Sequence, residues 1–216
     1  GEINVNYLDP QNVDTIKATD KFDIFPYSEG RLAYLMFNEN SDTKQLNKKE
    51  VRQALSYALN QDELIQVSYG SKDYADTAKS ALTQDVLYHT NDVAFFNNDV
   101  NKAKELLKSA GAEGLKLRII IPGGNKVQEA QALYIQQKFK DIGVQLDVNS
   151  MDSSAWSQKF VDTNAKDFDL AISGYIMGYD PDAYRILYST GSSSNYSHYS
   201  NKEVDKLLEE GAGESD

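Results

Sequence analysis

Two aspartates on either side of a proline are the residues whose types and spacing could do chemistry in this chain. Asp180, Pro181 and Asp182 form a turn that carries two carboxylates. Such a pair can act as general acid and general base in the hydrolysis of a glycoside or a peptide. The other interpretation is structural, because an Asp that begins a turn also caps the helix after it. No opposing partner is visible for either carboxylate, so we favour the structural interpretation and keep a hydrolase as the alternative.

The residues around this turn suit a surface that holds a ligand. Tyr175, Met177, Gly178 and Tyr179 lead into Asp180, and more tyrosines follow with Ser and Asn between them: Tyr184, Tyr188, Tyr196 and Tyr199. Tyr gives a large contact area at low entropic cost, and Ser and Asn give adaptable hydrogen bonds. No nucleophile, metal cluster or phosphate loop accompanies the stretch, which therefore predicts a binding surface.

The sequence gives little support for a metal site or a cofactor site. His89 and His198 are the only histidines, they lie far apart in the sequence, and the chain has no Cys. A structural or catalytic zinc site needs three or four such ligands. We expect no metal site, no cofactor and no catalytic residue.

The turn Pro122–Asn125 stands where a phosphate-binding loop would stand, between a predicted strand and a predicted helix. It has neither the Lys-Ser/Thr pair of a P-loop nor the three spaced glycines of a dinucleotide site. We interpret it as a tight turn. Ligands of open α/β sheets bind outside the carboxyl ends of the strands, so Gly124 and Asn125 are still expected beside the Tyr175–Asp182 loop.

Two arginines, Arg31 and Arg185, are candidates for a contact with the ligand. An arginine beside a cleft can hold a carboxylate in a bidentate fork. Each is more often a plain surface charge, and the sequence alone does not decide between the two roles.

Composition narrows the class of protein. The 216 residues carry 22 Lys and Arg against 33 Asp and Glu, a formal net charge of -11. Nucleic acid is an unsuitable partner, because a phosphate-binding face needs clustered basic residues. No stretch approaches the roughly 18 apolar residues of a membrane span. The start lacks the basic and apolar regions of a signal peptide, and we expect the chain to be part of a longer protein.

Apolar patterns predict the elements that must position these residues. Short apolar or alternating runs indicate strands at 32–37, 115–121, 144–148 and 168–173. Apolar residues at three- and four-residue spacing indicate helices at 51–59, 60–70, 100–110, 132–142, around 156–160, and 201–210. The strand–helix–strand run from 115 to 148 predicts two parallel strands with a right-handed crossover, and hence an α/β fold.

Local signals sharpen some boundaries. Asn47 with Glu50 and Asn60 with Glu63 both resemble capping boxes at helix starts. Gly70 is expected to end the second of these helices.

Two segments have no sustained period. Residues 71–98 are expected to be a long connection, and connections of this length are often functional. Residues 1–30, which contain Pro10 and Pro26, are expected to be an irregular lead-in.

In order and spacing, four stretches resemble the extracytoplasmic solute-binding proteins of oligopeptide, dipeptide and nickel ABC transporters. The start of the chain resembles the family's GEIDV segment, and residues 34–38 with 49–62 resemble its strand and its VRQALNYAIDR helix. Residues 101–111 resemble PEKAKELLKEAG. Residues 174–182, 195–201 and 204–208 resemble the GW, DPD and vDkLL region.

The resemblance implies the C-terminal lobe of a two-lobed, hinge-closing clamp. We expect one lobe of a periplasmic-binding-protein type II-like fold, with a mixed sheet flanked by helices. Residues 1–30 would be the inter-lobe lead-in, and 31–210 the ligand-binding lobe. The parent would bind oligopeptides outside the cell as a monomer and deliver them to an ABC transporter permease. It would be periplasmic or a membrane-anchored lipoprotein; haem, an oligosaccharide or a metal chelate stays open as cargo.

One departure from the family concerns the peptide amine. Many peptide-binding relatives carry an Asp just before the DPD-like turn, whereas this chain has Met177, Gly178 and Tyr179 there. Either Asp180 substitutes for it, or the protein does not anchor an N-terminal amine. Tyr175 stands where the family usually has Trp. The residues expected to line the cleft are Tyr175, Met177, Gly178, Tyr179 and Asp180, with Asn38, Gly124, Asn125 and Asn195 behind them.

Overall fold

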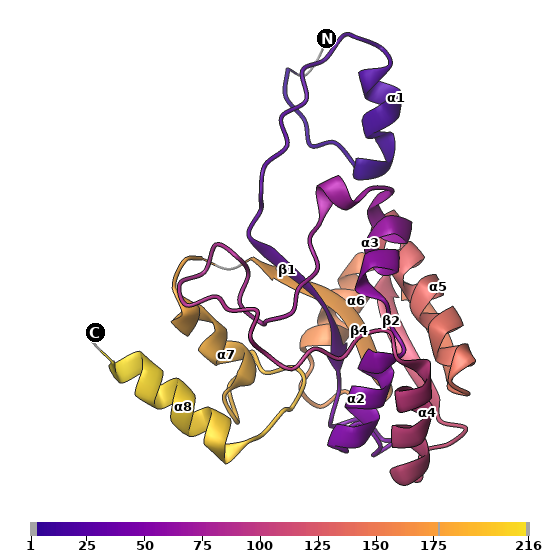
Figure 1. Cartoon of the computed structure of the whole chain (residues 1–216), viewed down its shortest axis with the longest axis vertical. Coiled ribbons are helices and arrows are strands. Elements are labelled where there is room, and N and C mark those ends of the chain that lie inside the picture. Colours follow the sequence, from indigo (N-terminus) through magenta and orange to yellow (C-terminus); the bar gives the residue numbers. More distant parts are fainter. Residues whose placement is uncertain (1–3, 177, 215–216) are drawn as a thin grey trace.

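A mixed sheet forms the centre of the molecule (Figure 1). This computed structural model describes residues 4–176 and 178–214. In the described part of the chain the sheet has four strands in the order β1-β4-β2-β3. Their bounds are β1 Arg31–Phe37, β2 Lys116–Pro122, β3 Gln145–Met151 and β4 Leu170–Ile176. All four lie at or within a few residues of the positions predicted from the sequence.

The strands pair to very different extents. β1 is antiparallel to β4, and β2 is parallel to β3, in both cases along seven residue pairs. β2 and β4 are also parallel, but only Ile119–Leu170 and Ile120–Ala171 pair. The parallel β2–β3 unit joined by one helix confirms the prediction, and the edge strand β1 makes the sheet mixed.

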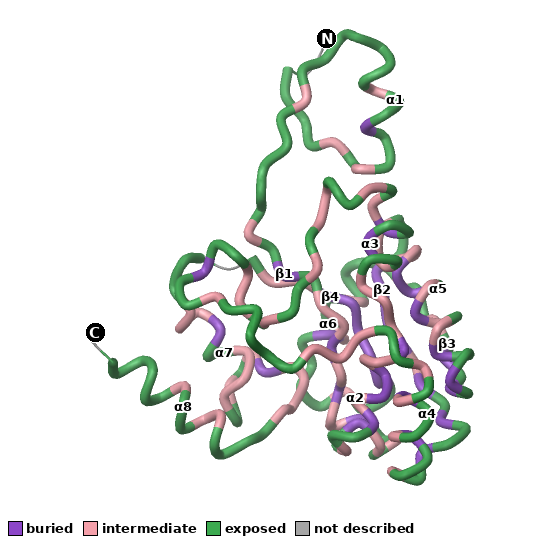
Figure 2. The backbone as a smooth tube through the Cα atoms, in the orientation of Figure 1, coloured by how far each residue is buried: buried purple, intermediate pink, exposed green. Residues whose placement is uncertain are grey.

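One face of the sheet is covered by four helices, which are α2 (Lys49–Tyr57), α3 (Gln61–Tyr69), α4 (Val100–Ser109) and α5 (Lys126–Asp141). The main hydrophobic core lies between them and the sheet, and Leu55, Leu107 and Phe139 are among its fully buried side chains. The buried positions of Figure 2 concentrate in this layer. Helices with one apolar stripe become stable here because that stripe is removed from water.

The other face carries two smaller clusters. Helix α6 (Ser153–Val161) places Phe160 against Met36 and Ile120, and Trp156 stacks on Phe160 with ring centroids 5.0 Å apart. Trp156 is partly buried and packs against this cluster. Nearer to the end of β4, Tyr184 packs with Leu32 of β1 and with Val86 of the 71–98 connection. Tyr184 ends the 3-10 turn Pro181–Tyr184, which leads into the short helix α7 (Arg185–Tyr188).

The first residues form an arm that extends away from the sheet (Figure 1). It contains the 3-10 turn Pro10–Asn12 and the short helix α1 (Val13–Lys17), where the sequence predicted only irregular chain. The arm exposes large apolar side chains: Val5, Tyr7, Phe22, Phe25 and Tyr27. An exposed apolar set of this size is typical of a surface that another part of a protein covers.

Three further details differ from, or refine, the predicted elements. Asn60 caps α3 as predicted, with its side chain accepting a hydrogen bond from Glu63 N at 3.2 Å, and Gly70 ends that helix at φ +76°. Asn47 does not cap α2, which begins after Lys48 without a side-chain cap. Helix α8 (Lys202–Gly213) extends beyond the predicted end at residue 210.

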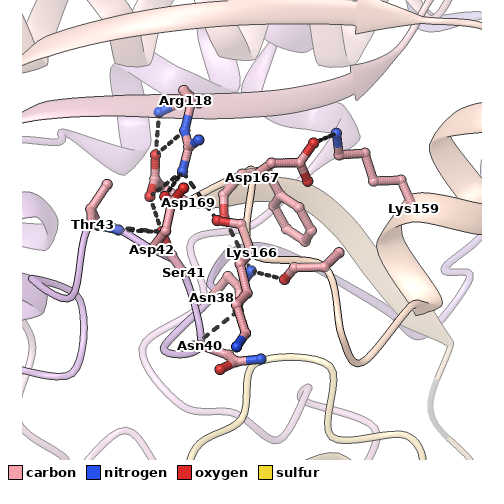
Figure 3. A network of polar contacts seen from close by, with 12 residues as sticks. Asn38, Asn40, Ser41, Asp42, Thr43, Arg118, Lys159, Lys166, Asp167 and Asp169 are labelled. Atoms are coloured by element: carbon pink, nitrogen blue, oxygen red, sulfur yellow. Dashed lines mark hydrogen bonds and ion pairs between the residues drawn. The ribbon is translucent and has the colours of Figure 1, made fainter.

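A buried carboxylate joins three strands at the edge opposite to the carboxyl ends of β2 and β4 (Figure 3). Asp169 precedes β4 and is fully buried. It accepts hydrogen bonds from Arg118 N at 2.7 Å, from Arg118 Nε at 3.0 Å and from the hydroxyl of Ser41. Asp169 and Asp42 raise the pKa of the Arg118 guanidinium above its ordinary value, with Asp169 the larger cause. The start of β4 is thereby attached to β2 and to the turn after β1.

In the described part of the chain, no helix has both the length and the apolar character needed to cross a membrane.

The two sides of helix α5 give a matched test of the core. Ile135 is buried and Leu133 is 62% exposed. Ile135→Ala should lower the free energy of unfolding by about 2–5 kcal/mol, because the removed methylenes leave a cavity. Leu133→Ala should change it by no more than about 0.5 kcal/mol. Urea unfolding followed by the fluorescence of Trp156 measures both, and equal losses would contradict this packing.

The two carboxylates that pair with Arg118 should also differ in how much they contribute to the free energy of unfolding. Asp169→Ala removes a fully buried carboxylate and leaves the partly buried guanidinium and backbone amide of Arg118 without their acceptor, and should cost about 3 kcal/mol. Asp42 binds the same arginine, but its side chain is 59% exposed, so Asp42→Ala should cost about 1 kcal/mol or less. The same urea titration compares them, and a larger cost for Asp42→Ala would overturn the assignment.

Candidate functional site

The candidate site lies at the edge of the sheet where the carboxyl ends of β2, β3 and β4 meet. These three strands are mutually parallel through β2. β1 runs the other way, so its first residue, Arg31, reaches the same edge and pairs with Ile176, the last residue of β4. The loops after β2 and β4 therefore project from one rim, as the sequence predicted.

A crevice is expected between β2 and β4 at this rim. The two strands pair only at Ile119–Leu170 and Ile120–Ala171, and no pair joins them beyond these residues. The chain leaves β2 toward α5 on one face, and leaves β4 toward Tyr184 on the other. Connections that depart to opposite faces define a topological switch point, which is where open α/β sheets bind their ligands.

The turn after β2 is a tight structural turn. Gly123 N donates to Met151 O at 2.7 Å, and a Cβ at Gly123 would lie 3.1 Å from Ser150 Oγ. Gly124 has φ +83°, which favours glycine. The Asn125 side chain accepts from Gln128 N at 3.1 Å and so caps α5. Together with Asp9 of the arm and Ser153 of α6, this turn lines a shallow hollow.

A phosphate or carboxylate would find the amides of this turn already engaged. Gly124 N donates to Glu129 Oε1 at 3.0 Å, and Lys126 Nζ lies 2.9 Å from Glu129 Oε2. Lys126 first, and then the Gly124 amide, lower the pKa of Glu129. The chain's own carboxylate thus occupies the place of an anion. This supports the interpretation of Pro122–Asn125 as a turn and not a phosphate loop.

The loop after β4 presents both side chains and backbone. Tyr175 is half-buried in the cluster around Tyr184, whereas Tyr179 is 75% exposed. Gly178 is exposed, and nothing lies within 4 Å of where its Cβ would be. Met177, also predicted to line the cleft, lies outside the described residues.

The carboxylates of the Asp180-Pro181-Asp182 turn have structural partners. Asp180 accepts from Asp182 N at 2.9 Å and caps the 3-10 turn, as the structural interpretation predicted. Asp182 forms an ion pair with Arg185, Oδ1 to Nε, at 2.9 Å. Neither carboxylate is set opposite the other across a cavity, so the geometry gives the acid–base alternative no support.

Two of the predicted residues face inward. Asn38 is 1% exposed, and its amide donates to Ala165 O and Phe168 O while its oxygen accepts from Asn40 N. Asn195 is 4% exposed and donates to Ser189 O and Tyr199 O. These side chains satisfy buried backbone groups, and Asn38 lies next to Asp169 at the edge of the sheet opposite to the rim. Nothing in the sequence distinguishes an asparagine that bonds buried backbone groups from one that contacts a ligand.

The 71–98 connection contributes residues that the sequence analysis did not select. Leu87 N donates to Tyr179 O at 3.0 Å, so this connection lies directly against the loop after β4. Leu87 and Tyr88 are 60% and 79% exposed there. Only the length of the connection indicated a functional role. The described residues contain no group of three or more His, Cys, Asp or Glu side chains placed to hold a metal ion.

The class of protein follows from the fold and its rim. A mixed sheet flanked by helices is the periplasmic-binding-protein type II-like arrangement. Residues 1–198 match the bacterial extracellular solute-binding proteins, family 5 Middle. The chain therefore belongs to that family, as the sequence resemblance predicted.

Individual relatives agree in fold and extent. The crystal structure of the ABC transporter substrate-binding protein CtaP from Listeria monocytogenes superposes with a TM-score of 0.95 at 43% identity, over 100% of this chain and 44% of that chain. The oligopeptide-binding protein AppA of Bacillus subtilis is 28% identical over 99% of this chain and 42% of its own length. The peptide transport protein SapA of Salmonella typhimurium is 30% identical over 82% and 33%. The chain thus spans less than half the length of these relatives.

Stability should depend on pH through His198, which lies three residues after Asn195. Burial lowers the pKa of its imidazole below the ordinary 6.5. The folded chain then holds the proton less tightly than the unfolded chain, so stability rises with pH between the lowered pKa and 6.5. That contribution is complete above pH 6.5 and is lost as the pH falls toward the lowered value.

An NMR titration of the histidine ring protons measures this directly, with His198→Gln identifying the resonance. A pKa of His198 at or above 6.5 would contradict the burial. In urea unfolding, His198→Gln should remove this part of the pH dependence.

Proposed function

We propose that this chain is the ligand-binding C-terminal lobe, residues 31–210, of a two-lobed protein that binds oligopeptides outside the cell. The full-length protein closes on the peptide as a monomer and delivers it to an ABC transporter permease. It is periplasmic or a membrane-anchored lipoprotein, and it is not an enzyme. Residues 1–30 are the segment that passes between the lobes.

The observation that carries this proposal is the open edge of β4 at the rim. Beyond Ala171 no β2 residue pairs with β4, and the Ile172 carbonyl on this side accepts from Gln128 Nε2 at 3.2 Å. Backbone groups alternate in direction along a strand paired to β1. Gly174 and Ile176 therefore direct their N–H and C=O groups into the same crevice as Ile172.

An extended peptide can add to such an edge as a further strand. Main-chain hydrogen bonds then supply affinity without reading the sequence, and side-chain pockets supply selectivity. Tyr175 lies in β4 itself, and Gly178, Tyr179 and Asp180 come after the strand. These are the residues that we propose to contact the peptide, with Met177 among them and Gly124 and Asn125 on the β2 side.

The names of the relatives support peptide as cargo. AppA is an oligopeptide-binding protein and SapA a peptide transport protein. The exposed apolar residues of the arm, such as Tyr7 and Phe25, support a covering second lobe. A clamp gains closing free energy only from a ligand that contacts both of its lobes.

Mass spectrometry on the full-length protein tests the proposal. Protein purified from its host and then denatured should release short peptides. Many sequences would indicate a nutrient transporter, and a single one a signalling peptide. Release of haem, of an oligosaccharide or of a metal chelate would replace peptide as the cargo. Turnover of a peptide or glycoside that Asp180→Asn abolishes would replace the binding function with hydrolysis.

The strand-addition geometry makes a separate prediction about the ligand. A released peptide, resynthesised with one main-chain nitrogen methylated at a position facing β4, should bind about tenfold or more weakly, because a charge-free hydrogen bond is lost and its acceptor stays buried. Single alanine substitutions in the same peptide should have smaller effects at most positions. Isothermal titration calorimetry compares the two series, and the reverse ranking would contradict main-chain recognition.

A further inference from the structure

The four arginines of the chain are not in equivalent surroundings. Arg52 forms an ion pair with Glu39 at 3.2 Å, Arg118 pairs with Asp169 and Asp42, and Arg185 pairs with Asp182. Among the described residues, Arg31 has no carboxylate within ion-pair distance. In a chain with 33 acidic and 22 basic residues, an arginine without such a partner is available for another carboxylate.

Arg31 lies at the rim where the ligand is proposed to bind. It is the first residue of β1 and pairs with Ile176, the last residue of β4. Ala33, two residues on, is opposite Gly174. Arg31 therefore lies beside the end of β4, the strand whose other edge is open.

Gly174 provides the room for this placement. A Cβ on Gly174 would lie 2.6 Å from Arg31 Nε and 2.8 Å from Arg31 Nη2. The guanidinium thus lies directly on the β4 backbone at a position without a side chain. Gly174 is also one of the residues whose main-chain groups we propose to meet the peptide, so the cation adjoins the expected ligand path.

The planar guanidinium of Arg31 presents paired N–H donors that match the two oxygens of a carboxylate. Its positive charge is also felt by the Tyr69 hydroxyl at the end of helix α3. Burial raises the pKa of that hydroxyl, and the charge of Arg31 opposes the rise.

We propose that Arg31, seated on Gly174, binds a carboxylate of the ligand and makes an acidic group part of the specificity of this lobe. The inference rests on the proposed peptide-binding function. The carboxylate is either the C-terminus of the peptide or a Glu or Asp side chain within it. Arg31 is thus a specificity-determining residue, in a place where Asp180 and Asp182 are already engaged by their own turn.

The test uses the full-length protein, freed of ligand by denaturation and refolding, and a tryptic digest of casein as the probe. Peptides retained by the wild-type protein are identified by mass spectrometry, and the most abundant is resynthesised in three forms: unmodified, C-terminally amidated, and with each Glu and Asp replaced by Gln and Asn. Calorimetric titration then compares the three forms on wild type and on Arg31→Gln.

The wild type should lose roughly 10- to 100-fold in affinity with one of the two neutralised forms, the size expected for a hydrogen-bonded charge. Amidation as the harmful change assigns the C-terminus, and side-chain neutralisation assigns an acidic residue. Arg31→Gln should bind the unmodified peptide about as weakly as the wild type binds the neutralised form that loses affinity. The variant should bind the unmodified and the neutralised form with equal affinity.

Two variants separate this role from a general loss of structure. Gly174→Ala should displace the flexible guanidinium and reduce the discrimination between peptide forms, with little change in thermal unfolding. Arg185→Gln removes an arginine that already has Asp182 as partner, and should leave the discrimination unchanged.

Different outcomes would contradict the role of Arg31 and the peptide-binding function on which it rests. Peptide binding by the wild type with equal affinity for all three forms, or discrimination that persists in Arg31→Gln, overturns the role of Arg31 and leaves peptide binding intact. Retention of no casein peptide by the wild type overturns both.

Discussion

The arrangement of the rim depends on how β4 is held at its other end. Asp169, fully buried just before β4, accepts from the backbone and guanidinium of Arg118 in β2 and from Ser41 after β1. Asn38 N donates in turn to Asp169 O at 2.8 Å. β1, β2 and β4 are therefore tied together at this end, and β1 stays paired with β4 along its whole length. From there β2 and β4 share only two residue pairs, so the edge of β4 beyond Ala171 is not paired with β2. A buried ion pair adds little net stability compared with an apolar core, but it specifies which groups must meet.

Polar side chains near the crevice are mostly engaged by the lobe itself, and this decides what the site can do. Asn125 and Asp180 cap the elements that follow them, and Glu129 occupies the amide of Gly124. What remains for a ligand is main chain on β4, exposed aromatic surface at Tyr179 and Tyr88, and the cation of Arg31. Such a combination suits an extended polar chain better than a small molecule that is held by many directed side-chain contacts.

Sequence patterns predicted the strands and most helices because each element shows its own period. The stripe through Val51, Ala54 and Leu55 is buried as a stripe must be, and the alternating or continuous runs became the four strands. Capping was predicted less well: Asn60 caps α3, yet Asn47 leaves α2 uncapped. A cap depends on the path by which the chain enters the helix, and tertiary contacts set that path.

The site could be predicted only as far as local chemistry extends. The turn at Pro122–Asn125 and the loop after β4 were placed at one rim from strand direction alone. Asn38 and Asn195 are almost fully buried, which the residues around them in the sequence do not indicate. Leu87 was not selected because its bond to Tyr179 O joins residues far apart in the sequence. The same distance separates Arg31 from Gly174, whose contact no local pattern contains.

The pairing of β1 with β4 has a consequence for the order of folding. The β2–α5–β3 unit is local, whereas β1 must wait for β4, which lies near the other end of the described chain. Closing a loop of that length costs conformational entropy before any strand contact repays it. β1 should therefore join the sheet late, and until then it leaves an apolar strand and an unpaired β4 edge exposed. The rim that we propose as the peptide site is then completed in the last step of folding, when Arg31 reaches Ile176.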